Sequence, residues 1–236
     1  MHSVREWLKE ARSVAVLTGA GVSAESGVPT FRDKGGLWKQ HRAENLATPE
    51  AFERDPKLVW EWYNWRRSVL AATQPNPGHY ALVELEKRIP EFTLITQNVD
   101  GLHELAGSRN VLRLHGSVWV LCCISCGRER EDRRASLPEL PPMCECGGML
   151  RPGVVWFGEP LPPRVWRDAE GAARAADLFL VVGTSAVVYP AAGLARIAKA
   201  AGARVVEINI AETAISDQID EFLRGPCGEL LPQLMA

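Results

Sequence analysis

Residues 14–21 read VAVLTGAG, and this stretch decides the class of fold. Residues 14–18 form a short apolar run that predicts a buried strand, and Gly19-Ala20-Gly21 predicts a tight turn directly after it. Short buried strands that alternate with helical patterns predict an α/β fold, in which helices cover both faces of a parallel sheet. The other predicted strands are residues 92–96, 111–114, 154–157, 178–182 and 205–208.

Small or polar residues follow five of these strands at the point where each strand ends. In open α/β sheets, ligands bind outside the carboxyl ends of the strands. Segments that are far apart in the chain therefore predict one shared site at that edge. The residues are Gly19, Gln97 to Asp100, His115, Gly183 to Ser185, and Asn209.

The glycines after the first strand fit the dinucleotide-binding pattern Gly19-x-Gly21-x-x-Ala24. Glycine at these places lets backbone N–H groups approach a pyrophosphate closely. A tight turn without a ligand is the alternative. A hydride-transfer dehydrogenase would continue into a second strand that ends in Asp or Glu about 20 residues further on. Residues 31–36 (FRDKGG) intervene without such a strand, which argues against that class of enzyme.

Composition narrows the class of protein. The 236 residues correspond to one or two domains, and the apolar (46%) and charged (24%) fractions are typical of a globular chain. Lys and Arg total 27 against 29 Asp and Glu, a net charge of −2, so we expect no specific nucleic-acid partner and no membrane surface. No apolar run is long enough for a membrane span, and Glu6 and Glu10 disfavour a targeting peptide. We therefore expect a cytoplasmic protein.

Four of the six cysteines form two close pairs, Cys123-x-x-Cys126 and Cys144-x-Cys146, separated by 17 residues. Two thiolate pairs provide four soft ligands for a tetrahedral structural zinc ion. A redox Cys-x-x-Cys would leave the second pair unexplained. A zinc ribbon that binds nucleic acid is disfavoured, because residues 123–146 carry four Arg against five Asp and Glu.

His115 is the histidine best placed for chemistry, because it alone among the five follows a predicted strand with a glycine behind it. With an ordinary pKa of about 6.5, a histidine can act as a base at neutral pH. A structural hydrogen-bonding role is the alternative.

Tyr63 and Arg66 are three residues apart in a predicted helix (WEWYNWRR), so they share a face. A tyrosine hydroxyl and a guanidinium together suit one carboxylate. The alternative is a helix that packs through its aromatic residues and carries a surface arginine. Arg67 projects about 100° away from Arg66, and we expect it to be solvated.

Six stretches occur in order along almost the whole chain and together resemble the sirtuins, a family of NAD-dependent protein deacylases. They are GAGVSAESGVPTFR (19–32), QNVDGLH (97–103), HGS (115–117), VVWFGE (154–159), GTS (183–185) and Asn209.

The resemblance implies a reaction in which NAD is a consumed co-substrate rather than a hydride carrier. The amide oxygen of an acylated protein lysine attacks C1′ of the ribose and releases nicotinamide. His115 then deprotonates a ribose hydroxyl, which attacks the acyl carbon, while Asn98 and Asp100 lie beside the nicotinamide and its ribose. Free lysine and O-acyl-ADP-ribose are the products.

The resemblance also implies the NAD contacts. Phe31 shields the reacting face, Arg32 contacts the phosphates or the loop over them, and the backbone of Cys227 contacts the adenine end. A solvated Arg32 is the alternative. The full set is Gly19, Ala20, Gly21, Ser23, Glu25, Thr30, Phe31, Arg32, Trp38, Gln97, Asn98, Asp100, His115, Gly183, Thr184, Ser185, Asn209 and Cys227.

The pair Tyr63-x-x-Arg66, with the small Ala47 in LATP (46–49), resembles the class III sirtuins, which remove succinyl, malonyl or glutaryl groups. We therefore predict desuccinylase activity with weaker deacetylase activity. Residues 154–157 are predicted to add the substrate peptide as a strand, with a plain core strand as the alternative. The substrate set is Ala47, Tyr63, Arg66, Val154, Val155, Trp156, Phe157, Gly158 and Glu159.

The resemblance implies a Rossmann-like NAD-binding domain with a smaller inserted helical and zinc-ribbon module, and an active site between the two. The boundaries are 1–36, 76–116 and 153–236 for the first and 37–75 and 117–152 for the second. Alternative functions are plain NAD-dependent deacetylation, mono-ADP-ribosyl transfer, and a non-catalytic NAD- or zinc-dependent interaction module. The sequence leaves the oligomeric state open.

Overall fold

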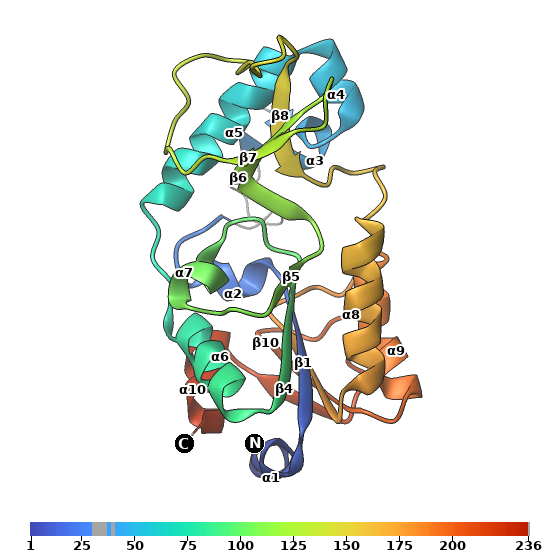
Figure 1. Ribbon diagram of the computed structural model, residues 1–236. Coiled ribbons are helices and arrows are strands. Elements are labelled where there is room, and N and C mark those ends of the chain that lie inside the picture. The colour runs from blue at the N-terminus through green and yellow to red at the C-terminus, as the bar shows by residue number, and fades with distance from the viewer. Residues whose placement is uncertain (30–36, 39–40, 236) are drawn as a thin grey trace.

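Six parallel strands form the main sheet of the computed structural model, which describes residues 1–29, 37–38 and 41–235 (Figure 1). Each strand is parallel to its neighbours, so the predicted Rossmann-like α/β fold is confirmed. In spatial order the strands are β11 (Glu221–Arg224), β10 (Arg204–Asn209), β9 (Leu178–Val182), β1 (Ser13–Thr18), β4 (Glu91–Thr96) and β5 (Val111–Arg113).

Helices cover both faces of this sheet (Figure 1). Val14 and Val16 of β1 enter one core, and Ala15 and Leu17 enter the other. Because both faces are covered, every residue of β9 is buried, which explains its uninterrupted apolar sequence. No helix in the described part of the chain is long and apolar enough to span a membrane. The covering helices are α1 (His2–Glu10), α6 (Pro77–Arg88) and α10 (Cys227–Met235) on one face, and α8 (Pro163–Ala175) and α9 (Leu194–Ala200) on the other.

Two consecutive helices begin with the same local signal, a capping side chain followed by a proline. Thr48 Oγ1 accepts a hydrogen bond from the N–H of Ala51 at 3.1 Å, and Asp55 Oδ1 accepts one from the N–H of Leu58 at 2.9 Å. The predicted helix start at Thr48-Pro49 is therefore confirmed. The helices are α4 (Pro49–Arg54) and α5 (Pro56–Ala71).

A smaller group of elements forms a core of its own beside the main sheet (Figure 1). Trp60 and Trp62 of α5 are buried in one cluster with Val118 and Leu121 of an antiparallel three-stranded sheet. The sheet consists of β7 (Glu129–Glu131), β6 (Gly116–Cys123) and β8 (Leu150–Val154). The helices α3 (Ala43–Leu46) and α4 add residues to the same core. The strands β2 (Leu37–Trp38) and β3 (His41–Arg42) form a separate antiparallel pair.

The predicted strand at residues 154–157 is wrong in position, because β8 ends at Val154. The chain then leaves the sheet and bonds to loop carbonyls. The N–H of Val155 donates to the carbonyl of His115 at 3.0 Å, and the N–H of Phe157 donates to the carbonyl of Ala47 at 2.9 Å. This path connects the main sheet edge with the loop before α4.

Arg67 is buried, so the prediction of a solvated side chain is wrong. Its side chain is 0% exposed and contacts the small sheet from α5. The guanidinium donates to the backbone carbonyls of Val118 at 2.7 Å, Asp132 at 2.6 Å and Arg134 at 2.8 Å, and to the carboxylate of Asp132 at 3.0 Å. The helical rotation away from Arg66 therefore directs this side chain into the small sheet rather than into water.

Arg67→Met is expected to lower the free energy of unfolding by about 3–5 kcal/mol, because it leaves three backbone carbonyls without their charged donor. The Asp132 carboxylate keeps its bonds from Arg134. Urea denaturation followed by circular dichroism measures the loss. Arg130→Met on β7 removes a charge from an exposed position and should change stability by less than about 0.5 kcal/mol. Equal losses in the two variants would contradict the structural role of Arg67.

Candidate active site

The carboxyl ends of the strands bring several predicted polar residues together at one edge of the main sheet. Gln97 follows β4, Thr184 follows β9, and Asn209 ends β10. Gln97 Nε2 donates to Thr184 Oγ1 at 3.0 Å, and Asn209 Nδ2 donates to the carbonyl of Thr184 at 2.8 Å. Ser185, next in the chain, is half-buried. Three strands thus contribute to one hydrogen-bonded polar row.

The turn after β1 contacts the turn after β9, and this close contact depends on Gly19, Gly21 and Gly183. The N–H of Gly21 donates to the carbonyl of Gly183 at 2.7 Å, and a Cβ at Gly21 would lie 2.7 Å from that oxygen. A Cβ at Gly19 would lie 2.6 Å from the Cβ of Thr184. Contact between the turns after β1 and β9 therefore explains these glycines without a ligand. Ala20 begins the short helix α2 (Ala20–Ala24) beside this contact.

A hydrogen-bonded group joins Asn98 and Asp100, which follow β4 in the chain, with Ser23 of α2. Asn98 Nδ2 donates to the carbonyl of Gly19 at 3.0 Å and to Ser23 Oγ at 3.2 Å, and the Ser23 hydroxyl donates to Asp100 Oδ2 at 2.8 Å. The N–H of Leu102, which begins α7 (Leu102–Ala106), donates to Asp100 Oδ1 at 2.9 Å. Burial raises the pKa of Asp100, against the opposing effect of the bonds from Leu102 and Ser23. These contacts fix the orientation of the Asn98 amide at the edge of the sheet.

His115 lies just after β5 with one ring nitrogen occupied. Its Nδ1 is 3.0 Å from the carbonyl oxygen of Gln97, which can only accept, so Nδ1 carries the proton and Nε2 carries the lone pair. No hydrogen bond to Nε2 is made by any residue that the structure describes. Burial lowers the pKa of His115 below its ordinary value, and the bond to Gln97 offsets this only in part. A neutral ring with a lone pair on Nε2 is the form that a general base requires.

Glu25 and Cys227 bind each other at the start of α10. The Cys227 thiol and the N–H of Gly228 both donate to Glu25 Oε1, each at 3.0 Å. Burial, together with the neighbouring carboxylate, raises the pKa of the Cys227 thiol. This cysteine is therefore a neutral buried group rather than a nucleophile, and the NAD contacts of both residues stay predictions.

Three predicted NAD contacts, Thr30, Phe31 and Arg32, lie outside the described residues. The backbone of Trp38 belongs to β2, and its side chain also lies outside the description. The roles of all four residues stay predictions.

His79 and His103 form a buried pair that the sequence does not reveal. Their ring centroids are 4.9 Å apart. His79 Nδ1 accepts from the N–H of Asn76 at 3.2 Å, and His103 Nε2 lies 3.0 Å from Thr18 Oγ1. Burial lowers the pKa of His79 to about 3 and that of His103 to about 4, so both rings are neutral at pH 7. For His79 the local signal is its position three residues after the helix cap Asn76, whereas no local pattern marks His103 as its partner.

Lowering the pH from 7 to 5 is expected to reduce the free energy of unfolding by about 2 kcal/mol for each of these two histidines. The unfolded chain, with pKa values of about 6.5, binds protons that the folded rings do not, so stability is full above about pH 6.5 and falls toward pH 4. Urea denaturation at pH 7 and pH 5 measures the loss. His103→Gln should remove about half of this pH dependence. An unchanged dependence in the variant would show that His103 is not held neutral.

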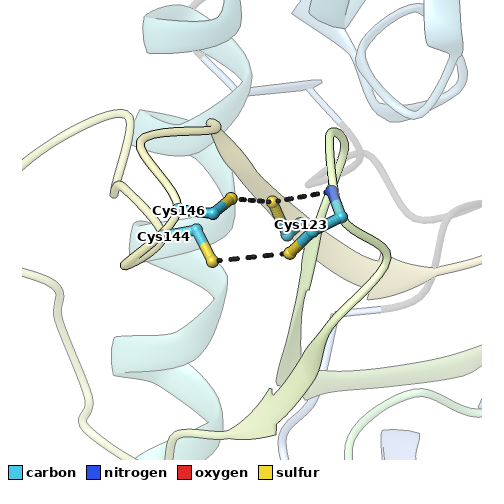
Figure 2. A group of neighbouring side chains, drawn as sticks. Cys123, Cys144 and Cys146 are labelled. Carbon is cyan, nitrogen blue, oxygen red and sulfur yellow. Dashed lines mark hydrogen bonds between the residues drawn. The ribbon is translucent and has the colours of Figure 1, made fainter.

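Four cysteine thiols meet at one end of the small sheet (Figure 2). The sulfurs of Cys123 and Cys146 are 3.5 Å apart, those of Cys126 and Cys144 are 3.9 Å apart, and all four lie within 4.8 Å of one another. Zn–S bonds of about 2.3 Å in a tetrahedron place sulfurs about 3.8 Å apart, so the cluster fits a structural zinc ion. Cys122 is the neighbour of Cys123 and is not part of the cluster.

The residues predicted to bind the acyl group lie at the core of the small module. Tyr63 is 4% exposed, and burial raises its pKa to about 12, so its hydroxyl stays protonated. Arg66 is half-buried one turn along α5, with its guanidinium carbon 5.2 Å from the ring centroid of Trp62. The charge of Arg66 lowers the pKa of both Tyr63 and Asp100, each against a larger effect of burial. Arg66 therefore acts electrostatically on Tyr63 among the predicted acyl residues and on Asp100 in the group around Asn98.

The segment from the end of β8 to Glu159 has both buried and exposed side chains. Val154 and Trp156 are buried, whereas the Phe157 side chain is 47% exposed. Gly158 has a φ of +89°, which favours glycine, and Glu159 forms an ion pair with Arg151 at 2.6 Å. The predicted role of this segment as a peptide-binding strand stays a prediction, with Phe157 as its accessible apolar side chain.

Known proteins resemble this chain over nearly its full length. The family profile described as "SIR2: Sir2 family" matches residues 19–190. NAD-dependent protein deacylase 2 of Pyrobaculum aerophilum is 56% identical over 234 residues, which is 99% of this chain and 94% of that protein. NAD-dependent protein deacylase of Aquifex aeolicus is 57% identical over 212 residues, which is 89% of each.

Solved structures give the same result. The crystal structure of a Sir2 homologue–NAD complex has a TM-score of 0.95 at 49% identity and covers 99% of this chain and 92% of that one. A Sir2 bound to an acetylated peptide has a TM-score of 0.88 at 31% identity and covers 100% and 97%. Matches of this length and identity lead to one assignment: the chain belongs to the Sir2 family, the sirtuins.

Proposed function

We propose that this chain is an NAD-dependent protein-lysine deacylase that removes succinyl and malonyl groups, and acetyl groups more weakly. The deacylase activity is supported above all by His115, which is neutral and lies at the same edge of the sheet as Asn98. No residue that the structure describes bonds to the Nε2 lone pair of His115, so this nitrogen can accept a proton. The names of the relatives, NAD-dependent protein deacylases, support this activity. A similar solved structure holds 2′-O-acetyl ADP ribose, which is an O-acyl-ADP-ribose.

His115 acts as the general base in this proposal. When NAD is bound, it supplies a ribose carbon that the acyl-lysine oxygen attacks as nicotinamide leaves. His115 Nε2 accepts a proton from a ribose hydroxyl, which makes that oxygen a nucleophile toward the acyl carbon. The carbonyl of Gln97 holds Nδ1–H and stabilises the charge that the ring gains. Hydrolysis then yields lysine and O-acyl-ADP-ribose.

Asn98 and Asp100 stabilise the ribose while positive charge develops on it. The contacts of Asn98 with Gly19 and Ser23 hold its amide in place before the substrate binds. A preorganised polar group costs little reorganisation at the moment of reaction, which is where such groups contribute most to the rate.

The acidic acyl preference is supported by Tyr63, Arg66 and Ala47. A protonated phenol and a guanidinium on one helix face can bind a carboxylate through charge-assisted hydrogen bonds. Ala47 is small and buried, and its carbonyl is bonded to the segment that precedes Gly158. The Tyr-x-x-Arg pair is the feature that assigns the class III type within the proposal.

The same proposal divides the chain into an NAD-binding domain (1–36, 76–116 and 153–236) and a small helical and zinc-binding module (37–75 and 117–152). Support for the small module comes from packing, since one hydrophobic cluster joins buried residues between Leu46 and Leu70 with others between Val118 and Leu150. The same cluster also includes Val154 and Trp156, from the start of the segment 153–236.

Two peptides that differ only in carrying succinyl-lysine or acetyl-lysine test the proposal, each incubated with enzyme and NAD and followed by mass spectrometry. We expect a higher kcat/KM for the succinyl peptide, which Arg66→Met lowers about 10- to 100-fold while changing that for the acetyl peptide little. Arg130→Met is the matched control. Acetyl removal alone would overturn the acidic preference. ADP-ribose transferred to peptide without lysine release would favour ADP-ribosylation, and no turnover would favour a non-catalytic module.

A further inference from the structure

Trp156 is bonded to the hydroxyl of Tyr63. Its indole Nε1–H donates to Tyr63 Oη at 2.9 Å. Trp156 is 3% exposed and Tyr63 is 4% exposed, so the two bonded side chains are buried together. This bond is the contact through which Trp156 can act on Tyr63.

The direction of this hydrogen bond determines what the tyrosine can do. An indole N–H only donates, so Tyr63 must accept from it and cannot send its own proton back. The described residues show no acceptor for the Tyr63 O–H. The phenol proton is therefore left to bond with a group that enters from outside, and a carboxylate is the acceptor that Arg66 on the same helix face would also attract.

Trp156 itself is held on several sides. The guanidinium carbon of Arg151 lies 3.6 Å from the centroid of the Trp156 ring, and the ring of Phe52 lies 5.2 Å from it. Arg151 donates to both carboxylate oxygens of Glu159 at 2.6 and 2.8 Å, and Glu159 Oε2 accepts from the backbone N–H of Trp156 at 2.8 Å. These contacts fix the position of the indole N–H.

We propose that Trp156 is a positioning residue for acyl selectivity: its indole N–H occupies one lone pair of the Tyr63 hydroxyl and directs the phenol proton toward the acyl carboxylate at Arg66. The inference rests on the proposed acidic acyl preference. An acetyl group has no carboxylate to receive this proton, so the effect of Trp156 is confined to acidic acyl groups.

Trp156→Phe tests the inference, because it keeps an aromatic ring under Arg151 and removes the N–H donor. We expect the ratio of kcat/KM for a succinyl-lysine peptide to kcat/KM for the matched acetyl-lysine peptide to fall about 5- to 10-fold, through a rise in KM for the succinyl peptide. In a Tyr63→Phe background the same substitution should leave the succinyl-to-acetyl ratio unchanged.

Trp60→Phe is the matched control, since Trp60 is buried in the same core and its indole N–H donates to the carbonyl of Leu150 at 2.8 Å. It should lower thermal stability without changing the succinyl-to-acetyl ratio. Equal changes for both acyl groups in Trp156→Phe, or the same change in ratio in Trp60→Phe, would overturn the positioning role.

Nuclear magnetic resonance of the wild-type protein labelled with ¹⁵N in its indole rings gives a second readout that does not depend on folding of the Trp156 variant. The succinyl-lysine peptide should shift the Trp156 indole N–H resonance, and the acetyl-lysine peptide should not. Identical shifts would overturn the inference.

Arg66→Met separates this inference from the proposed function. A wild-type enzyme without succinyl preference overturns both. A preference that depends on Arg66 but not on Trp156 overturns the positioning role alone.

Discussion

His115→Ala is expected to lower kcat for deacylation by about 10²- to 10⁴-fold, the usual contribution of a general base. The reason is specific to the ring: Nδ1–H is bonded to the carbonyl of Gln97, so Nε2 is the nitrogen that can take a proton. Steady-state assays with a succinyl-lysine peptide and saturating NAD measure the loss.

The pH profile distinguishes a base from a structural histidine. Burial lowers the pKa of His115, so the acid limb of kcat/KM should lie below about pH 6.5 in the wild type and disappear in His115→Ala. Added imidazole should restore part of the rate. His2→Ala, an exposed histidine in α1, is the control and should behave as wild type. A His115→Ala variant that keeps its rate and its acid limb would contradict the mechanism.

Cys123→Ser is expected to abolish zinc binding and to unfold the small antiparallel sheet. Structural zinc contributes about 10–16 kcal/mol of apparent binding free energy in small zinc domains, and that energy depends on all four thiolates. Cys123 ends β6, which joins the cluster to the core shared with α5. Zinc content by elemental analysis and the melting temperature measure the two effects.

Cys122→Ser is the matched control, because it removes the adjacent thiol, which is not one of the four. It should keep one zinc ion per chain and a melting temperature close to that of the wild type. Equal damage from both substitutions would show that the four-thiol cluster does not hold the metal.

Local patterns in the sequence predict most of the main sheet. Buried parallel strands such as β9 are continuous apolar runs, and Thr48-Pro49 shows where a helix begins. The strand β11 has no continuous apolar run, because Leu223 is its one buried residue. The strand predicted at 154–157 is misplaced because the apolar residues after Val154 bond to the carbonyls of His115 and Ala47 rather than to a neighbouring strand. An apolar run in the sequence does not distinguish these two cases.

Local patterns also predict which residues follow the strands, because the carboxyl ends of parallel strands lie at one edge. They do not predict partners that are distant in the chain. Tyr63 and Trp156 are 93 residues apart, and Arg67 and Val118 are 51 apart. A helix pattern gives the direction of Arg67 relative to Arg66, but only the tertiary structure shows that the small sheet lies in that direction.

The most direct test of the proposed activity is a quantitative product analysis of one reaction, with a succinyl-lysine peptide, NAD and the zinc-loaded enzyme, by mass spectrometry. Equal amounts of nicotinamide, unmodified lysine peptide and O-succinyl-ADP-ribose are expected. Unmodified peptide formed together with free succinate while NAD remains intact would contradict the proposed NAD-dependent activity.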